Sequence, residues 1–126
     1  MIPKFQSFFK MILEVLADRE IHKKSSISND IARRYNISQD DLKEQTKRNS
    51  GLTKFEDRIS WAIVYLLKAD MISRVHTGHY KITEKGTHLL SLGYDKIDNF
   101  TLGQHSEQFA KYQYMRTGKK PQKRNG

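Results

Sequence analysis

A long helix followed directly by a β-hairpin is the sequence feature that most constrains this fold. Residues 53–56 read Thr-Lys-Phe-Glu, a capping box that opens a helix, and helical spacing of apolar residues continues to about Lys68. Two β-prone runs, 71–75 and 80–83, then flank a four-residue connection that contains Gly78. Such a connection is typical of a hairpin. The main apolar stripe of the long helix comprises Phe55, Ile59, Ala62, Ile63, Leu66 and Leu67.

Shorter helices are predicted before this unit. Residues 4–18 carry apolar side chains at helical spacing on one face. A short strand is predicted at 23–27, and Ser28 then looks like the N-cap of a second helix that ends at Asn36. Ser38 opens a third helix. Two short helices with a tight break between them are typical of a helix-turn-helix.

The segment after the hairpin predicts a last short helix and then an extension. Thr83 is placed to cap that helix and Gly93 to stop it. Residues 104–115 have weak helical character, and disorder is expected from Arg116 onward. The predicted fold class is mainly α with a small β-hairpin, a winged helix-turn-helix. The predicted domains are 1–93, a DNA-binding winged helix, and 94–126, a C-terminal extension.

Charge and composition limit the function classes. The net charge is +9, six of the 23 basic residues follow Glu107, and no acidic residue does. A basic tail favours nucleic acid as a partner, although a plain solvated tail has the same composition. With no cysteine, the chain can form neither a disulfide nor a thiolate metal site. Neither a membrane span nor a signal peptide is apparent, so a cytoplasmic location is expected.

Three strings of residues together resemble a known family. Residues 50–62 read Ser-Gly-Leu-Thr-Lys-Phe-Glu-Asp-Arg-Ile-Ser-Trp-Ala, residues 65–72 Tyr-Leu-Leu-Lys-Ala-Asp-Met-Ile, and residues 78–86 Gly-His-Tyr-Lys-Ile-Thr-Glu-Lys-Gly. The chain resembles the N-terminal winged-helix domain of Mrr-type restriction proteins over roughly residues 2–92. That family shows a Pro-Ser-Gly loop, an Asn-Arg-x-x-Trp-Ala helix, a Leu-x-x-Ala-Gly-Leu turn and a wing ending in Ile-Thr-x-x-Gly. This sequence departs from the pattern at Asn49, Asp57 and 70–71.

The resemblance implies a module that directs a nuclease to foreign, typically modified, DNA, as in a type IV restriction system. The expected partner is double-stranded DNA, with its methylation left open, together with a nuclease domain or subunit. A nuclease core needs an acid and a Glu/Asp-x-Lys pair on a central sheet. The acid-x-Lys string at 41–43 falls in a predicted helix and looks like solvated surface. We therefore expect no catalytic residues, no cofactor and no enzymatic activity in this chain.

The candidate DNA-binding residues gather at the start of the long helix and on the hairpin. A reading helix contacts base edges near its N-terminus, while basic residues beside it bind phosphates. Arg58 can pair with guanine and Asp57 can accept from cytosine. The predicted set is Lys47, Arg48, Ser50, Gly51, Thr53, Lys54, Asp57, Arg58, Arg74, His76, His79 and Lys81, with Lys23 and Lys24 as further phosphate contacts.

Each of these residues also has a structural interpretation. Asp57 suits the positive end of a helix, and Arg58 can form an ion pair with Asp57 or Glu56. Trp61 could stack on a base, but its position deeper along the helix favours the core. His76 and His79 lack the further ligands that a metal site needs.

Two other functions remain open at this point. A winged-helix transcriptional regulator would share the fold and differ in its partner. A protein-interaction winged helix would have no role on DNA. The sequence gives neither the DNA sequence nor the oligomeric state, so a homodimer also stays open.

Overall fold

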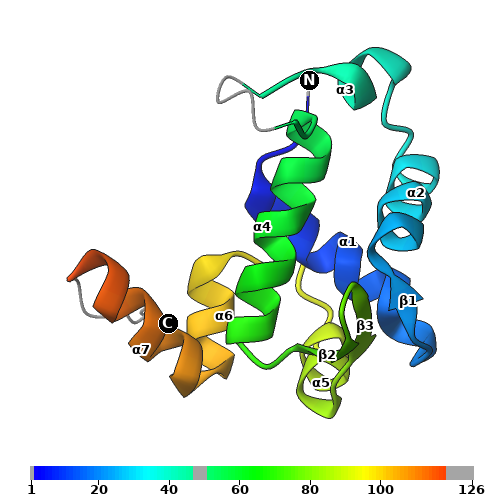
Figure 1. The fold of residues 1–126 in the computed structure, drawn as a ribbon. Coiled ribbons are helices and arrows are strands. Elements are labelled where there is room, and N and C mark those ends of the chain that lie inside the picture. The colour runs from blue at the N-terminus through cyan, green and yellow to red at the C-terminus, as the bar shows by residue number, and fades with distance from the viewer. Residues whose placement is uncertain (1, 47–50, 119–126) are drawn as a thin grey trace.

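The computed structural model describes residues 2–46 and 51–118, which are mainly helical with one small antiparallel sheet (Figure 1). Among these residues, no helix is both long and apolar enough to cross a membrane. This architecture is the one expected for a winged helix. The elements in chain order are η1 (Phe5–Ser7), α1 (Phe8–Val15), η2 (Leu16–Asp18), β1 (His22–Lys23), α2 (Lys24–Arg34), α3 (Gln39–Lys43), α4 (Lys54–Lys68), β2 (Ile72–His76), β3 (His79–Ile82), α5 (Glu84–Ser91), α6 (Asn99–His105) and α7 (Glu107–Thr117).

The contact between α1 and α4 forms the centre of the core. Phe8 and Phe55 meet edge to face with ring centroids 5.8 Å apart, and Phe9 stacks against Tyr65 at 6.1 Å. Such aromatic pairs contribute about 0.5–1.5 kcal/mol beyond the area that they bury. Helices α2 and α5 add their own buried residues to the same cluster, among them Ile27, Ile31 and Leu89.

Side-chain caps fix three of the helix starts that the sequence predicts. The Ser38 hydroxyl accepts from the N–H of Asp41, and the Thr83 hydroxyl accepts from the N–H of Gly86. The predicted capping box at α4 is complete, because the Thr53 and Glu56 side chains each bond the other residue's N–H. These caps satisfy backbone donors that the first helical turn leaves unpaired.

The sheet has the order β1-β3-β2, and both neighbouring pairs are antiparallel. Ile72 lies opposite Ile82, so both side chains face the core at the base of the hairpin. The connection is shorter than predicted, since β2 runs to His76 and β3 begins at His79. That leaves a two-residue turn in which Gly78 has a φ of 74°, which a glycine adopts readily.

Several predicted element boundaries were wrong. The 4–18 helix is α-helical only from Phe8 to Val15, with a 3-10 turn at each end. Strand β1 is only His22–Lys23, and α2 begins at Lys24 rather than after Ser28. Ser28 lies inside this helix, where its hydroxyl donates to the Lys24 carbonyl. A serine within a helix makes this bond instead of capping the N-terminus.

The C-terminal extension is more ordered than the sequence suggests. Two helices replace the one weak segment, and Ser106 caps the second by accepting from the N–H of Phe109. Phe109 is fully buried and lies 5.7 Å from Tyr65 of α4. Arg116, predicted to be disordered, belongs to α7. Residues 94–118 thus share the hydrophobic core of the winged helix, and the tail beyond lies outside the described residues.

Close packing of α5 against the start of β2 generates a stability prediction. A Cβ atom at Gly86 would overlap the Met71 carbonyl and lie 2.9 Å from Cγ1 of Ile82. We expect Gly86→Ala to lower the free energy of unfolding by about 1–3 kcal/mol, measured by denaturant titration, because the backbone must shift.

Gly103→Ala in α6 is the matched control. The nearest atom there lies 3.9 Å from the added Cβ, and alanine favours a helix. If the two variants proved equally stable, the close approach at Gly86 would not be a constraint on the fold.

Candidate nucleic-acid interface

The loop before α4 is closed by backbone pairing at its base. Gln45 and Thr53 form an antiparallel bridge, and the N–H of Lys54 donates to the Glu44 carbonyl at 2.8 Å. Gly51 is exposed and has a φ of 84°, a conformation that favours glycine. The two ends of the loop are therefore held together beside the start of α4. Three predicted contact residues on it, Lys47, Arg48 and Ser50, lie outside the described residues.

Two predicted contact residues at the start of α4 are engaged within the protein. The Thr53 hydroxyl donates to the Glu56 carboxylate at 2.9 Å and accepts from the Glu56 N–H at 3.2 Å. Lys54 forms an ion pair with Glu44 at 2.9 Å. Both residues thus hold the helix start and the loop base together. Asp57, one turn along, is half-buried.

Arg58, the predicted guanine reader, is turned back into the protein. Its Nη1 donates to the carbonyls of Ile2 and Pro3, each at 2.9 Å, in a partly buried setting. The guanidinium therefore ties the N-terminal segment to α4. These bonds are neither a base contact nor the ion pair with Asp57 or Glu56 considered as its alternative. Its role on DNA remains an untested prediction.

The strand register divides the hairpin residues between the two faces of the sheet. Arg74 lies opposite Tyr80, on the same face as the core pair Ile72 and Ile82 but nearer the exposed tip. Side chains alternate along a strand, so Lys81 points to the other face. His79 shares that outer face, and its partner on β1 is Lys23. We call the set Lys23, Ser73, His79 and Lys81 the outer sheet face.

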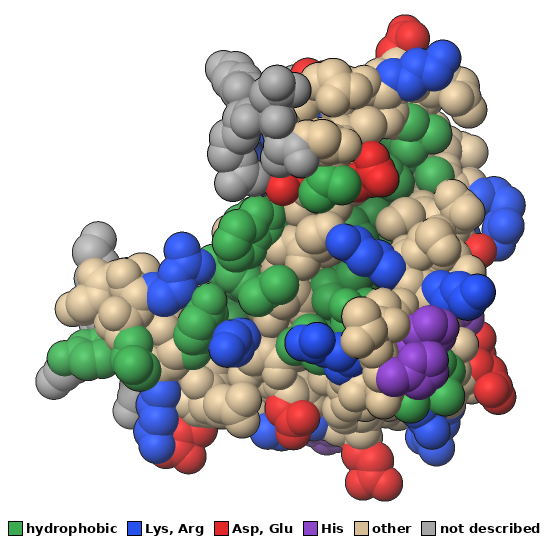
Figure 2. All heavy atoms as spheres, viewed as in Figure 1, with side chains coloured by type: hydrophobic (Ala, Val, Ile, Leu, Met, Phe, Trp, Pro, Cys, Tyr) green, Lys and Arg blue, Asp and Glu red, His purple; other side chains and the backbone are tan. Residues whose placement is uncertain are grey.

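The hairpin tip is attached to the start of α2. The N–H of Lys24 donates to the Gly78 carbonyl at 3.0 Å. The rings of His76 and His79 lie against each other with centroids 3.9 Å apart. In Figure 2, Lys, Arg and His side chains spread over the face that α4 and the hairpin present to the viewer. Lys24 also lines a groove of about 550 Å³ between α2 and the start of α4, together with Ser28, Asn29, Leu42, Thr53 and Phe55.

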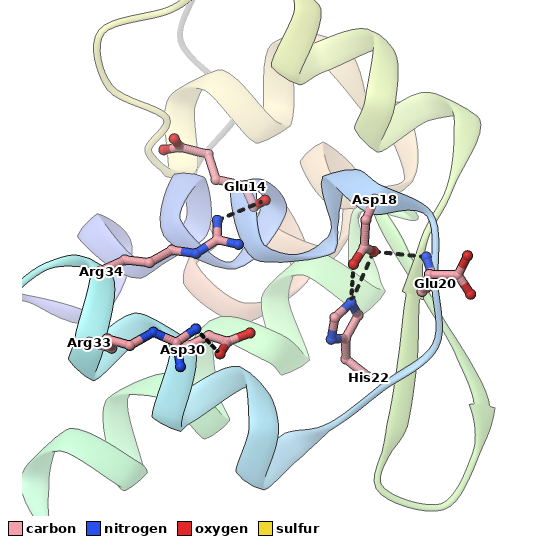
Figure 3. Close-up of polar contacts among 7 residues, drawn as sticks. All are labelled: Glu14, Asp18, Glu20, His22, Asp30, Arg33 and Arg34. Atoms are coloured by element: carbon pink, nitrogen blue, oxygen red, sulfur yellow. Dashed lines mark hydrogen bonds and ion pairs between the residues drawn. The ribbon is translucent and has the colours of Figure 1, made fainter.

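Polar contacts around α1 hold β1 and α2 in place (Figure 3). The Asp18 carboxylate bonds His22 of β1 at 2.9 Å and the N–H of Glu20 at 2.8 Å. Burial alone would raise the pKa of Asp18, but these two bonds and the charges of His22 and Arg34 outweigh it and lower the pKa. The carboxylate therefore stays ionised and keeps its bonds to His22 and Glu20. These bonds anchor the strand that carries Lys23.

Helix α2 is braced against α1 by a second pair of contacts. Arg34 donates to the Glu14 carbonyl at 3.4 Å (Figure 3). The Tyr35 hydroxyl donates to the Glu14 carboxylate at 3.0 Å. Burial and this bond to Glu14 raise the pKa of Tyr35 to about 12. The phenol therefore keeps its proton, and its hydrogen bond, at neutral pH.

Trp61 was wrongly predicted to be a core residue. Its side chain is 42% exposed, whereas Ile59 and Ala62 beside it in sequence are fully buried. Trp61 belongs to a different stripe of α4, with Asp57, Val64 and Lys68, which faces away from the core. The sequence does place Trp61, Val64 and Tyr65 on a second side of this helix, and their apolar character predicts burial there. Periodicity alone does not indicate which side of the helix stays exposed.

The comparisons with known proteins bear on this arrangement. The model of the Mrr N-terminal domain matches residues 5–91, from the first helical turn to the end of α5. The chain belongs to the Mrr N-terminal domain family. No curated protein and no solved structure matched the chain.

Membership of the Mrr N-terminal domain family associates the chain with restriction systems. The wing-end glycine of its Ile-Thr-x-x-Gly string is Gly86, which lies where a side chain would overlap the Met71 carbonyl, just before β2. Helices α6 and α7 lie beyond the matched residues. Within the residues that the structure describes, no three His, Asp or Glu side chains come together as metal ligands could.

The Arg58 contacts generate a prediction about stability. We expect Arg58→Ala to lower the free energy of unfolding by about 1–2 kcal/mol, because it leaves two carbonyls without their charged donor. Chemical denaturation measures this loss. Arg74→Ala, which removes an exposed arginine from the hairpin, should change it little. An Arg58→Ala protein of unchanged stability that lost its preference among duplexes would instead identify Arg58 as a reader.

Proposed function

We propose that this Mrr N-terminal domain binds double-stranded DNA and targets a modification-dependent, type IV restriction system to it, without nuclease activity of its own. The observation that carries the proposal is the outer sheet face, on which the register brings together the exposed lysines Lys23 and Lys81. Family membership supports it independently, because it associates the chain with restriction systems.

In the proposed complex α4 enters the major groove. A reading helix approaches base edges with its exposed side and its N-terminal turns, while flanking groups bind the phosphates. Lys23 and Lys81 lie exposed on the outer sheet face, and Lys24 borders the groove beside α4. Arg74 extends the charge to the other side of the hairpin. These four cations would fix the register of the duplex.

The proposal assigns DNA cleavage to another segment or chain. The acid-x-Lys string at 41–43 lies in α3. This helix has five residues and is not part of the sheet. Nuclease chemistry of this kind uses such a string on a central sheet beside a further acid, where the carboxylates hold Mg²⁺. The domain would therefore supply position and selectivity, and a nuclease domain or subunit would supply the chemistry.

The first test of DNA binding is its salt dependence. Each phosphate neutralised by the protein contributes about 0.9 to the negative slope of log K against log salt concentration. We expect Lys23→Ala and Lys81→Ala each to lower that slope by about this amount, on every duplex alike. Fluorescence anisotropy of a labelled duplex, titrated at several salt concentrations, measures it.

Lys96→Ala is the control for this series, since Lys96 is exposed in the loop beside α1 rather than on the outer sheet face. It should leave the slope unchanged. Binding by the parent that did not vary with salt, or an equal loss with all three variants, would remove the support for a phosphate-binding sheet face.

A second test concerns the tail. Truncation after Gly118 keeps α7 complete and removes four basic residues, Lys119, Lys120, Lys123 and Arg124. We expect affinity to fall by a similar factor on all duplexes, because phosphate contacts carry no sequence information. Replacing the same four residues by glutamine should have the same effect. Loss of preference between duplexes would instead mean that the tail reads sequence.

A further inference from the structure

Helix α4 carries two stripes of side chains with the same spacing. Phe55, Ile59, Ala62 and Leu66 form the core stripe and are almost fully buried. The second stripe begins two residues later, which is roughly the opposite side of a helix. Its members are Asp57, Trp61, Val64 and Lys68, all half-buried or exposed, and we call them the outward stripe.

The middle of the outward stripe is apolar. Trp61 is 42% exposed, and Val64 beside it is half-buried. Figure 2 shows hydrophobic side chains reaching the surface along the region of α4. Arg58 lies outside both stripes, and its guanidinium is bonded to the carbonyls of Ile2 and Pro3. On a helix that reads DNA, this surface would present apolar area to the base edges. An arginine at the same place would present two hydrogen-bond donors instead.

Cations lie at the C-terminal end of the outward stripe, whereas Asp57 lies at its N-terminal end. Lys68 ends the stripe, with its Nζ 5.3 Å from the Tyr112 ring centroid. Arg116 of α7 lies 5.7 Å and 5.9 Å from the Tyr65 and Tyr112 ring centroids, and it is exposed. An apolar strip with cations at one end complements a polyanion with apolar groups in its groove, whereas a second copy of this chain, with its net charge of +9, would bring like charges together.

We propose that Trp61 and Val64 contact the C5-methyl group of a pyrimidine in the major groove. The methyl at C5 is the apolar group that a base pair presents there, and apolar side chains recognise it. Thymine and 5-methylcytosine both carry this methyl group, so either base could make the contact. Trp61 is then a residue that determines specificity. This inference rests on the proposed DNA binding and adds the group that is read.

The chain contains a single tryptophan, so its fluorescence reports on this stripe alone. Trp61 is 42% exposed, so acrylamide should quench it in the free protein, and a bound duplex should shield it. The probe is one DNA fragment of mixed sequence, made by polymerase chain reaction with the four ordinary nucleotides. Acrylamide quenching is measured with and without saturating fragment, while anisotropy of a label on the DNA records binding independently.

The same fragment prepared in three further forms tests the methyl group. One is made with dUTP in place of dTTP, which removes every thymine methyl. The second form is made with dUTP in place of dTTP and 5-methyl-dCTP in place of dCTP. The third form keeps thymine and replaces only cytosine by 5-methylcytosine. Affinity is measured for the parent, Trp61→Ala, Trp61→Phe, and Leu92→Ala, a matched control whose apolar side chain is 45% exposed elsewhere. Thermal unfolding confirms that each variant is folded.

We expect the fragment to shield Trp61, and the parent to prefer a methylated form over the uracil form by about fourfold for each methyl contacted. Loss on uracil substitution alone identifies thymine, and recovery with 5-methyl-dCTP identifies 5-methylcytosine. Trp61→Ala should bind all four forms alike, Trp61→Phe should keep part of the preference, and Leu92→Ala should match the parent.

Two results would overturn the inference while leaving DNA binding intact. One is a bound duplex that leaves Trp61 as open to acrylamide as before. The other is a methyl preference that Trp61→Ala retains in full, which would assign it to DNA shape or to other residues. Absence of binding to every form by the folded parent would overturn the proposed function itself, and this inference with it.

Discussion

Burial of aromatic rings between α1 and α4 is the interaction on which the other elements depend. Phe8 and Phe9 of α1 meet Phe55 and Tyr65 of α4, so the contact spans three turns of the longer helix. The opposite side of α4 carries the outward stripe, whose residues are half-buried or exposed. Tyr65 then continues the contact into α7 through Phe109 and Tyr112. The same rings that close the core therefore also position the C-terminal helices.

Polar groups near the proposed interface fall into two classes with different tasks. Thr53, Glu56, Lys54 and Glu44 stabilise the start of α4 and the base of its loop, and Arg58 fixes the N-terminal segment. Within the described part of the chain, the exposed side chains of Lys23, Lys81 and Arg74 make no such bonds. A charged residue near the start of such a helix is thus weak grounds for inferring a base contact. Its neighbours in three dimensions decide what it does.

Features set by local chemistry could be predicted from the sequence, and those set by distant partners could not. The capping box, the Thr83 cap and the hairpin depend on residues within a few positions of one another. Trp61 was misplaced because the spacing of apolar residues shows only which sides of a helix are apolar. Which of those sides is covered depends on segments that are distant in sequence. Arg58 was assigned to DNA because its acceptors, the Ile2 and Pro3 carbonyls, are more than fifty residues away in sequence. Helix α7 was underestimated for the same reason, since Phe109 is buried through contacts with distant residues such as Tyr65.

The hydrogen bond from Lys24 to the Gly78 carbonyl has a consequence for how the domain would recognise a duplex. It ties the tip of the hairpin to the first turn of α2, so the ribbon cannot swing as an independent arm. Little conformational entropy would then be lost if the domain bound a duplex, which would favour affinity. A rigid ribbon also cannot follow variations in groove width. Sequences that bend or compress readily to match its fixed span would be favoured over stiff ones, even at base pairs that no side chain touches.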